Sequence, residues 1–284
     1  MAEHMSDDPH HGDRFVQLDD GDVRVVERGK SDTHAVLLLS NAAAPTAIWD
    51  PVVPFLDGAF RVIRVDLLGH GTLAVASGGY AITAQAHRIA AALDRLAVSR
   101  VTVIGHSSGC MLATALAEQR PDAVVALALI DMGPSLDAKL PDSPLFHLLM
   151  APVAGPLLWR LRTPESIRKA ARSGMARPVD IPDAFIEHAQ RLKLRDLVGT
   201  MRAAKHYLGE RSLPDRLAPL GVPLLVVFGA DDGRWRSSSA AEYRGVSGAR
   251  VELLAGVGHT PMMEDPETTG ALLLDFAHAT APAS

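Results

Sequence analysis

A serine between two glycines could supply a nucleophile. Ser107 is the central residue of the segment GHSSG, which directly follows an apolar run at residues 101–104 and directly precedes a helical pattern. A strand, a Gly-x-Ser-x-Gly turn and a helix together raise a serine hydroxyl above the edge of a sheet. Glycines suit this turn because side chains there would clash with the neighbouring backbone. The five residues alone are weakly specific, and the alternative is a glycine-rich turn with an incidental serine.

An acid and a histidine follow in the order that a nucleophilic serine needs. Asp231 and Asp232 come after the apolar run 223–228, and His259 comes after the run 251–254. The carboxyl ends of parallel strands meet at one edge of a sheet, so we expect these side chains to lie near Ser107. A histidine there would take the serine proton, and the acid would orient the histidine. The alternative for His259 by itself is a structural loop histidine.

Short apolar runs alternate with helical patterns along most of the chain. Near-continuous apolar runs predict strands buried on both faces, at residues 35–39, 61–65, 101–104, 124–130, 223–228 and 251–254. Residues 14–18 and 22–26 flank a turn signal and predict a hairpin. Helical spacing occupies residues 82–96, 110–118 and 266–278. The pattern predicts an α/β fold with a doubly wound, mostly parallel sheet.

One region breaks this alternation. Residues 135–217 contain helical patterns and many prolines but no convincing strand. We expect a helical cap, or lid, inserted into a core domain of residues 14–134 and 218–284, with residues 1–13 as a polar, disordered leader. The cap is rich in apolar residues, which either fill its own core or line an apolar substrate pocket. Its most apolar stretch, residues 145–161, is interrupted by His147 and two prolines and is too short to span a membrane.

Composition excludes several partners. The chain has 284 residues, 48% of them hydrophobic and 21% charged, with a formal net charge of −5. Without a basic excess, neither nucleic acid nor an anionic membrane is expected. The single cysteine, Cys110, allows no intrachain disulfide and fits a cytoplasmic protein, as does the lack of a signal-peptide pattern. No metal-ligand spacing and no cofactor motif is present, so we expect a small-molecule substrate, no metal and no cofactor. Nothing indicates the oligomeric state.

Four segments together resemble the α/β-hydrolase superfamily. They are residues 66–71 (DLLGHG), 105–109 (GHSSG), 229–232 (GADD) and 258–266 (GHTPMMEDP). The resemblance implies a catalytic triad of Ser107, Asp232 and His259. It places the acid at the fourth position of Gly-x-x-Asp, with Asp231 as the fallback. Asp131, at the end of an earlier strand, is a third choice. The superfamily assigns the first segment a structural turn, so Asp66 and His70 are not expected to be catalytic.

The chain departs from the superfamily after the strand at residues 35–39. Ser40-Asn41 stands where most relatives carry His-Gly, and the pair is similar to the 3-oxoadipate enol-lactonase branch. The resemblance puts Ala42 at the oxyanion-hole position, where only a backbone N–H is needed, together with the N–H of Ser108. We expect the substrate pocket to include Asn41, His106 and Trp159.

These features favour a cofactor-independent serine hydrolase. The expected reaction is cleavage of an ester or lactone of a moderately apolar small molecule through an acyl-enzyme intermediate. The same triad also serves carbon–carbon bond hydrolases, thioesterases and perhydrolases. A non-hydrolytic lyase or biosynthetic cyclase is a second class that the altered Ser40-Asn41 region keeps open. A binding or receptor protein is a third class, against which the intact Ser, Asp and His set argues.

Overall fold

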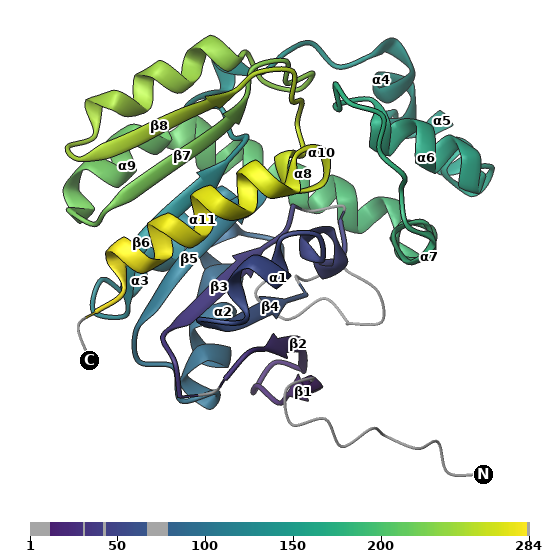
Figure 1. Ribbon diagram of the computed structural model, residues 1–284. Coiled ribbons are helices and arrows are strands. Elements are labelled where there is room, and N and C mark those ends of the chain that lie inside the picture. Colours follow the sequence, from purple (N-terminus) through teal and green to yellow (C-terminus); the bar gives the residue numbers. More distant parts are fainter. Residues whose placement is uncertain (1–11, 31, 42–43, 67–78, 283–284) are drawn as a thin grey trace.

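An eight-stranded sheet forms the centre of the protein (Figure 1). The computed structural model describes residues 12–30, 32–41, 44–66 and 79–282. The strand order is β1-β2-β4-β3-β5-β6-β7-β8. The strands are β1 (Gly12–Val16), β2 (Val23–Arg28), β3 (Ala35–Leu39), β4 (Arg61–Val65), β5 (Val101–His106), β6 (Val124–Ile130), β7 (Leu224–Gly229) and β8 (Ala249–Leu254). Strands β4, β3, β5, β6, β7 and β8 pair in parallel, whereas β2 is antiparallel to both of its neighbours. The prediction of a mostly parallel, doubly wound sheet is confirmed.

Helices cover both faces of this sheet (Figure 1). The helices of the core are α1 (Val53–Leu56), α2 (Ile82–Arg95), α3 (Ser108–Gln119), α9 (Leu213–Leu217), α10 (Pro261–Glu264) and α11 (Pro266–Thr280). One apolar cluster joins the sheet to α2 and α3 through residues such as Ile89 and Leu112. A second cluster on the opposite face joins it to α1 and α11 through Leu56 and Leu273. Every residue of β3, β5 and β7 is buried, as expected for strands that are covered on both faces.

The register brings the ends of four neighbouring strands to one edge. His106 at the end of β5 pairs with Ile130 at the end of β6, and Gly229 at the end of β7 pairs with Leu254 of β8. Chain segments that follow these strands therefore emerge side by side at the carboxyl edge of the sheet.

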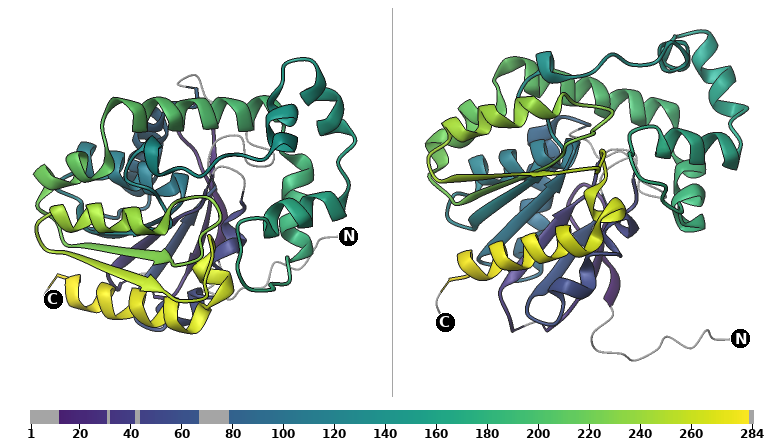
Figure 2. Two further views of the ribbon diagram at one scale, coloured as in Figure 1. Left: turned by 90° about the horizontal axis from the view of Figure 1, so that it is seen from above. Right: turned by 45° about the horizontal axis from the view of Figure 1, so that its top comes forward.

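A group of five helices connects β6 to β7. They are α4 (Pro144–Met150), α5 (Ala154–Arg160), α6 (Pro164–Arg172), α7 (Asp183–Arg191) and α8 (Leu194–Glu210). Figure 2 shows α4 to α7 projecting sideways beyond the sheet, while the long helix α8 runs back to the core. Tyr207 and Leu208 of α8 are buried in the cluster around α2 and α3. None of the described helices is long and apolar enough to cross a membrane.

The first strand begins earlier than the sequence pattern indicates. β1 starts at Gly12, so Gly12 and Asp13 belong to the hairpin and not to the predicted leader, of which residues 1–11 lie outside the described part of the chain. The Asp13 carboxylate accepts hydrogen bonds from Arg24 on β2 at 2.7 and 2.9 Å. Arg24 also donates to Asp66 at 2.8 Å, so Asp66 forms an ion pair with β2. The rest of its loop, residues 67–78 with His70, is outside the described residues.

Candidate active site

Ser107 occupies a tight turn between β5 and α3. Its backbone has φ 53° and ψ −122°, a conformation that a residue with a side chain rarely adopts. The two glycines make the turn possible. A Cβ on Gly105 would lie 2.6 Å from the Gly109 backbone, and one on Gly109 would lie 2.3 Å from the Leu39 carbonyl oxygen. Strand β5, helix α3 and strand β3 therefore approach one another more closely than any side chain allows, and the turn holds Ser107 at the sheet edge.

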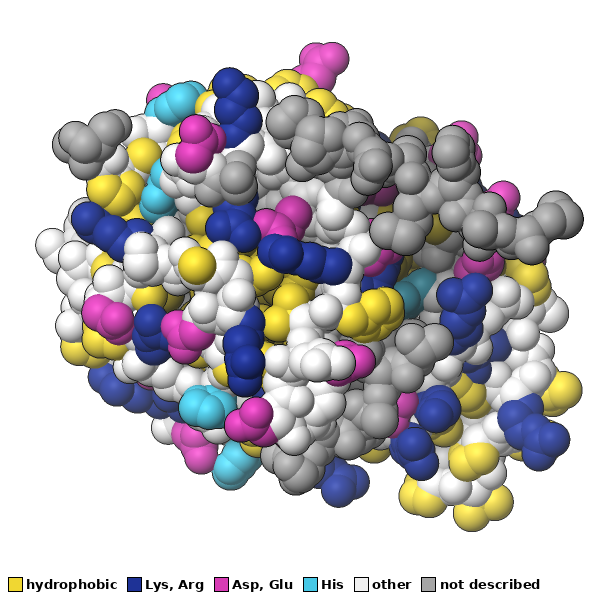
Figure 3. All heavy atoms as spheres, turned by 90° about the horizontal axis from the view of Figure 1, so that it is seen from below, with side chains coloured by type: hydrophobic (Ala, Val, Ile, Leu, Met, Phe, Trp, Pro, Cys, Tyr) yellow, Lys and Arg dark blue, Asp and Glu magenta, His cyan; other side chains and the backbone are white. Residues whose placement is uncertain are grey.

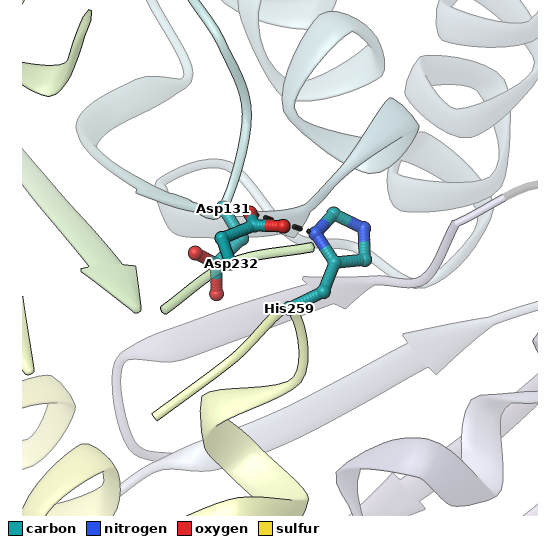
Figure 4. A group of neighbouring side chains, drawn as sticks. All are labelled: Asp131, Asp232 and His259. Atoms are coloured by element: carbon teal, nitrogen blue, oxygen red, sulfur yellow. Dashed lines mark hydrogen bonds and ion pairs between the residues drawn. The ribbon is translucent and has the colours of Figure 1, made fainter. Parts of the chain in front are cut away.

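Ser107, His259 and Asp232 form a hydrogen-bonded chain. The distance from His259 Nε2 to Ser107 Oγ is 3.1 Å, and that from His259 Nδ1 to Asp232 Oδ2 is 2.9 Å. An ionised carboxylate can only accept, so His259 Nδ1 carries the proton and Nε2 is free to accept from the serine hydroxyl. Figure 4 shows the imidazole of His259 directed at the two buried carboxyl groups. The arrangement has the geometry of a nucleophile, a base and an orienting acid.

The structure distinguishes between the two adjacent aspartates. Asp232 is buried, and its Oδ1 accepts hydrogen bonds from the backbone N–H of Arg234 at 2.6 Å and Trp235 at 3.2 Å. These contacts fix the carboxylate while Oδ2 faces His259. Asp231 is exposed. Asp232, the first choice from the sequence, is therefore the aspartate that meets the histidine.

Asp131, the third choice, lies beside Asp232 and His259, and its carboxyl group is in a different environment from that of Asp232. It is fully buried with φ 48°, and its Oδ1 accepts from the N–H of Gly229 at 2.8 Å. Burial, and then the charge of Asp232, raise the pKa of Asp131 well above its ordinary value. The raised pKa favours the protonated form of Asp131 beside Asp232. Its Oδ2 has no hydrogen-bond partner among the described side chains and backbone.

Asp131, Asp232 and His259 also form the one group of described residues whose spacing would suit a metal ion. Their ligand atoms lie within 4.8 Å of one another. However, Asp232 and His259 already use these atoms to hydrogen-bond each other, and His259 Nε2 faces Ser107. A metal ligand histidine needs a free lone pair directed at the ion. The donor set fits a hydrogen-bonded triad better than a cation site.

The oxyanion side of the site is described only in part. Ser108 is the first residue of α3, so its backbone N–H belongs to the positive end of the helix dipole, as an oxyanion donor requires. Ala42, the second predicted donor, lies outside the described residues. Cys110, one turn further along α3, is buried, and burial raises the pKa of its thiol. Ser107 therefore has no thiolate competitor at this position.

His106 does not line a pocket, contrary to the sequence-based expectation. Its side chain is fully buried, and burial lowers its pKa to about 3, so the ring is neutral. Nε2 lies 2.7 Å from the His259 carbonyl oxygen and must donate to it. Nδ1 then accepts from Asn41 Nδ2 at 3.3 Å. Asn41 and His106 together position the backbone of His259, a role that the sequence reasoning missed.

Trp159 lies in helix α5 of the cap. Its indole N–H donates to the Leu192 carbonyl at 3.1 Å, and the Arg162 guanidinium lies 3.8 Å from the ring centre. These contacts are all within the cap. Trp159 therefore holds α5 to the segment between α7 and α8, and no described contact joins it to the triad.

A buried glutamate connects the cap to the histidine loop. Glu264 accepts hydrogen bonds from the backbone N–H groups of Ala176, Arg177, Gly258 and Thr260 at 2.7 to 3.0 Å. Nearby, the N–H of His259 donates to the carbonyl of Gly174 at 2.8 Å. The sequence patterns indicated no role for Glu264, although it lies within the motif at residues 258–266. Residues 174–177 of the cap are thus fastened directly to the loop that carries His259.

Comparison with known proteins places the chain in a family. A model described as "Alpha/beta hydrolase family" matches residues 36–272. A protein of Bacillus subtilis (strain 168), provisionally named 2-succinyl-6-hydroxy-2,4-cyclohexadiene-1-carboxylate synthase, is 28% identical over 271 residues, covering 89% of this chain and 93% of that protein. Monoacylglycerol lipase abhd6-A of Xenopus laevis is 27% identical, covering 88% and 77%. The pimeloyl-[acyl-carrier protein] methyl ester esterase of Edwardsiella ictaluri (strain 93-146) is 26% identical, covering 88% and 94%.

Solved structures agree with this placement. Cfl2 from Burkholderia cenocepacia has a TM-score of 0.77 at 26% identity, covering 94% of this chain and 96% of that chain. The N-acyl homoserine lactonase AidH has a TM-score of 0.81 at 17% identity, which shows a shared fold. The chain belongs to the alpha/beta hydrolase family. The prediction of an enzyme of the α/β-hydrolase class is confirmed.

The raised pKa of Asp131 predicts a pH-dependent stability difference. The unfolded chain ionises this carboxyl above about pH 4, whereas burial and the charge of Asp232 raise its pKa in the folded protein. Its contribution is therefore complete below that pH and is lost as the pH rises. Asp131→Asn keeps the acceptor for Gly229 and cannot ionise, so it should gain stability over the native protein as the pH is raised from 4 to 8, by on the order of 1 kcal/mol. Urea unfolding at several pH values measures this. Asp231→Asn, on the exposed neighbour, is the control, and parallel curves for the native protein and Asp131→Asn would contradict the protonated state.

The contacts of Glu264 predict that its replacement lowers the stability of the protein and loosens residues 174–177 of the cap. In Glu264→Gln, an amide NH2 replaces one carboxylate oxygen and confronts backbone N–H donors. We expect a loss of about 2–4 kcal/mol in unfolding free energy and faster amide exchange at residues 174–177 and 258–260. Hydrogen-exchange mass spectrometry reads out the exchange. The exposed Glu267, three residues further on, is the matched control as Glu267→Gln. Unchanged exchange at residues 174–177 would show that Glu264 does not hold the cap.

Proposed function

We propose that the protein hydrolyses an ester or lactone bond through an acyl-enzyme formed on Ser107. The hydrogen-bonded chain from Ser107 Oγ through His259 to Asp232 carries this proposal. Each member comes from the carboxyl end of a different strand. A protein that only binds a ligand does not need these three hydrogen-bonded side chains.

The geometry supports a two-stage reaction. His259 Nε2 accepts the Ser107 proton while Oγ attacks the substrate carbonyl carbon, and Asp232 stabilises the imidazolium that forms. The Ser108 N–H, with that of Ala42 as the proposed second donor, binds the developing oxyanion. The intermediate collapses, and His259 gives its proton to the leaving alkoxide. Water, deprotonated by His259, then attacks the acyl carbonyl, and Ser107 Oγ leaves with the proton from His259.

Two features support a small, moderately apolar substrate without metal or cofactor. The triad has its own base and acid, so the proposed cycle needs no further reagent than water. Relatives that align over most of the chain are named as a monoacylglycerol lipase and a methyl ester esterase, which both act on acyl esters. The buried, free Cys110 supports a cytoplasmic location, where thiols stay reduced.

A second candidate is a non-hydrolytic lyase or synthase reaction on the same residues. The Bacillus subtilis relative named as a synthase, with 28% identity over 89% of this chain, favours it. In such a reaction His259 and Ser107 would remove and return a proton without acylation of the serine. The two candidates differ in whether a covalent acyl group forms.

Removal of the Ser107 hydroxyl tests the proposal. Ser107→Ala should lower kcat/KM for the best substrate in a panel of lactones, acyl esters and thioesters by about 10³-fold or more. A fluorophosphonate probe should label the native protein and fail to label this variant. Ser247→Ala, at an exposed serine, should behave as the native protein. Equal turnover by native protein and Ser107→Ala, with no labelling of either, would refute the serine hydrolase proposal.

A further inference from the structure

The two helices α4 and α5 expose an unusual amount of apolar surface. We call residues 143–164, which contain both helices, the cap hairpin. Seven large hydrophobic side chains are exposed in the described chain, and five of them lie here: Leu145, Leu148, Val153, Leu157 and Leu161. Val153 is 89% exposed and Leu145 is 68% exposed. In Figure 3, hydrophobic side chains gather at the tip of the lobe at lower right, with Lys and Arg side chains beside them. Such a cluster on one small element indicates an interaction surface.

The packing of the hairpin explains why these side chains face outward. A Cβ on Gly155 of α5 would lie 2.3 Å from the Leu149 carbonyl oxygen of α4, so the two backbones are in close contact there. Helix α4 has no buried residue, and α5 buries only Gly155. The helices therefore approach each other closely at Gly155, and Leu145, Leu148 and Leu157 remain exposed.

Basic side chains lie beside this apolar surface. The cap hairpin contains Arg160 and Arg162 but no Asp or Glu. Arg162 donates to the carbonyls of residues 189, 190 and 192, which places the exposed Lys193 beside the end of α5. Residues 135–217 hold 14 Lys and Arg against 9 Asp and Glu, whereas the rest of the chain holds 14 against 24. The cap is therefore basic and the core acidic, although the formal net charge of the whole chain is −5.

We propose that the cap hairpin docks on the surface of a membrane that carries anionic lipid headgroups. Exposed leucines beside basic side chains match the two layers of such a surface, acyl chains below and phosphates above. Helices α4 and α5 have seven residues each, so they lie in the interface and do not span the bilayer. A second copy of the chain fits less well, because a symmetric contact would place the basic hairpins against each other. Membrane docking is a function in addition to the proposed hydrolysis and does not depend on it.

Vesicle binding tests the proposal without a substrate. We expect the protein to sediment with vesicles of phosphatidylcholine and phosphatidylglycerol, and to bind pure phosphatidylcholine vesicles at least about tenfold more weakly. Leu145→Ser with Leu157→Ser should lower the partition coefficient about tenfold or more. Phe15→Ser with Leu253→Ser is the matched control, since these side chains are 54% and 49% exposed outside the cap, and it should bind as the native protein. Thermal unfolding verifies that both variants fold.

The charge contribution has its own variants. Arg160→Gln with Lys193→Gln should weaken binding roughly fivefold per residue, and added salt should remove this difference. Arg236→Gln with Arg244→Gln removes two exposed arginines outside the cap and should have little effect on vesicle binding. The proposal would be overturned if the protein fails to bind anionic vesicles or binds neutral ones equally well. It would also be overturned if Phe15→Ser with Leu253→Ser loses as much binding as Leu145→Ser with Leu157→Ser. A concentration-dependent dimer in sedimentation velocity that Leu145→Ser with Leu157→Ser abolishes would overturn it too.

Discussion

The close backbone contact between β3, β5 and α3 is the constraint on which the site depends. Gly105 and Gly109 leave no room for a side chain, and this contact forces Ser107 into a backbone conformation with positive φ. The strain is balanced by the sheet, whose central strands are buried on both faces. Because the strands are parallel, Asp232 and His259 emerge beside Ser107 at the same edge. The hydrogen-bonded triad therefore follows from the register of the sheet.

A second set of contacts fixes the histidine and joins it to the cap. The carbonyl of His259 accepts from the neutral His106, and its N–H donates to Gly174 of the cap. Glu264 fastens the same two segments through backbone N–H groups. The base is thus held by atoms of the core and the cap together. A movement of residues 174–177 would be transmitted to the base.

Sequence patterns predicted the parts of this structure that depend on local order. Apolar runs located the parallel strands, and the motifs located Ser107, Asp232 and His259, which the structure brings together. Contacts between residues that are distant in the sequence could not be predicted from these patterns. His106 was expected in the pocket because of its position in the motif, but it is fully buried. Trp159 packs within the cap, and its place in the substrate pocket stays a prediction. The start of β1 was missed because Gly12 is small and Asp13 is polar. Their antiparallel pairing with Glu27 and Val26 of β2 shows that they belong to the strand.

The central claim is that Ser107 becomes acylated during turnover. The most direct measurement is tandem mass spectrometry of the protein, quenched in acid during reaction with a slowly hydrolysed activated ester. The hydrogen-bonded triad predicts an acyl adduct on the peptide that contains Ser107, and its accumulation should depend on His259. Turnover without a covalent adduct, or an adduct on another residue, would contradict the proposed mechanism.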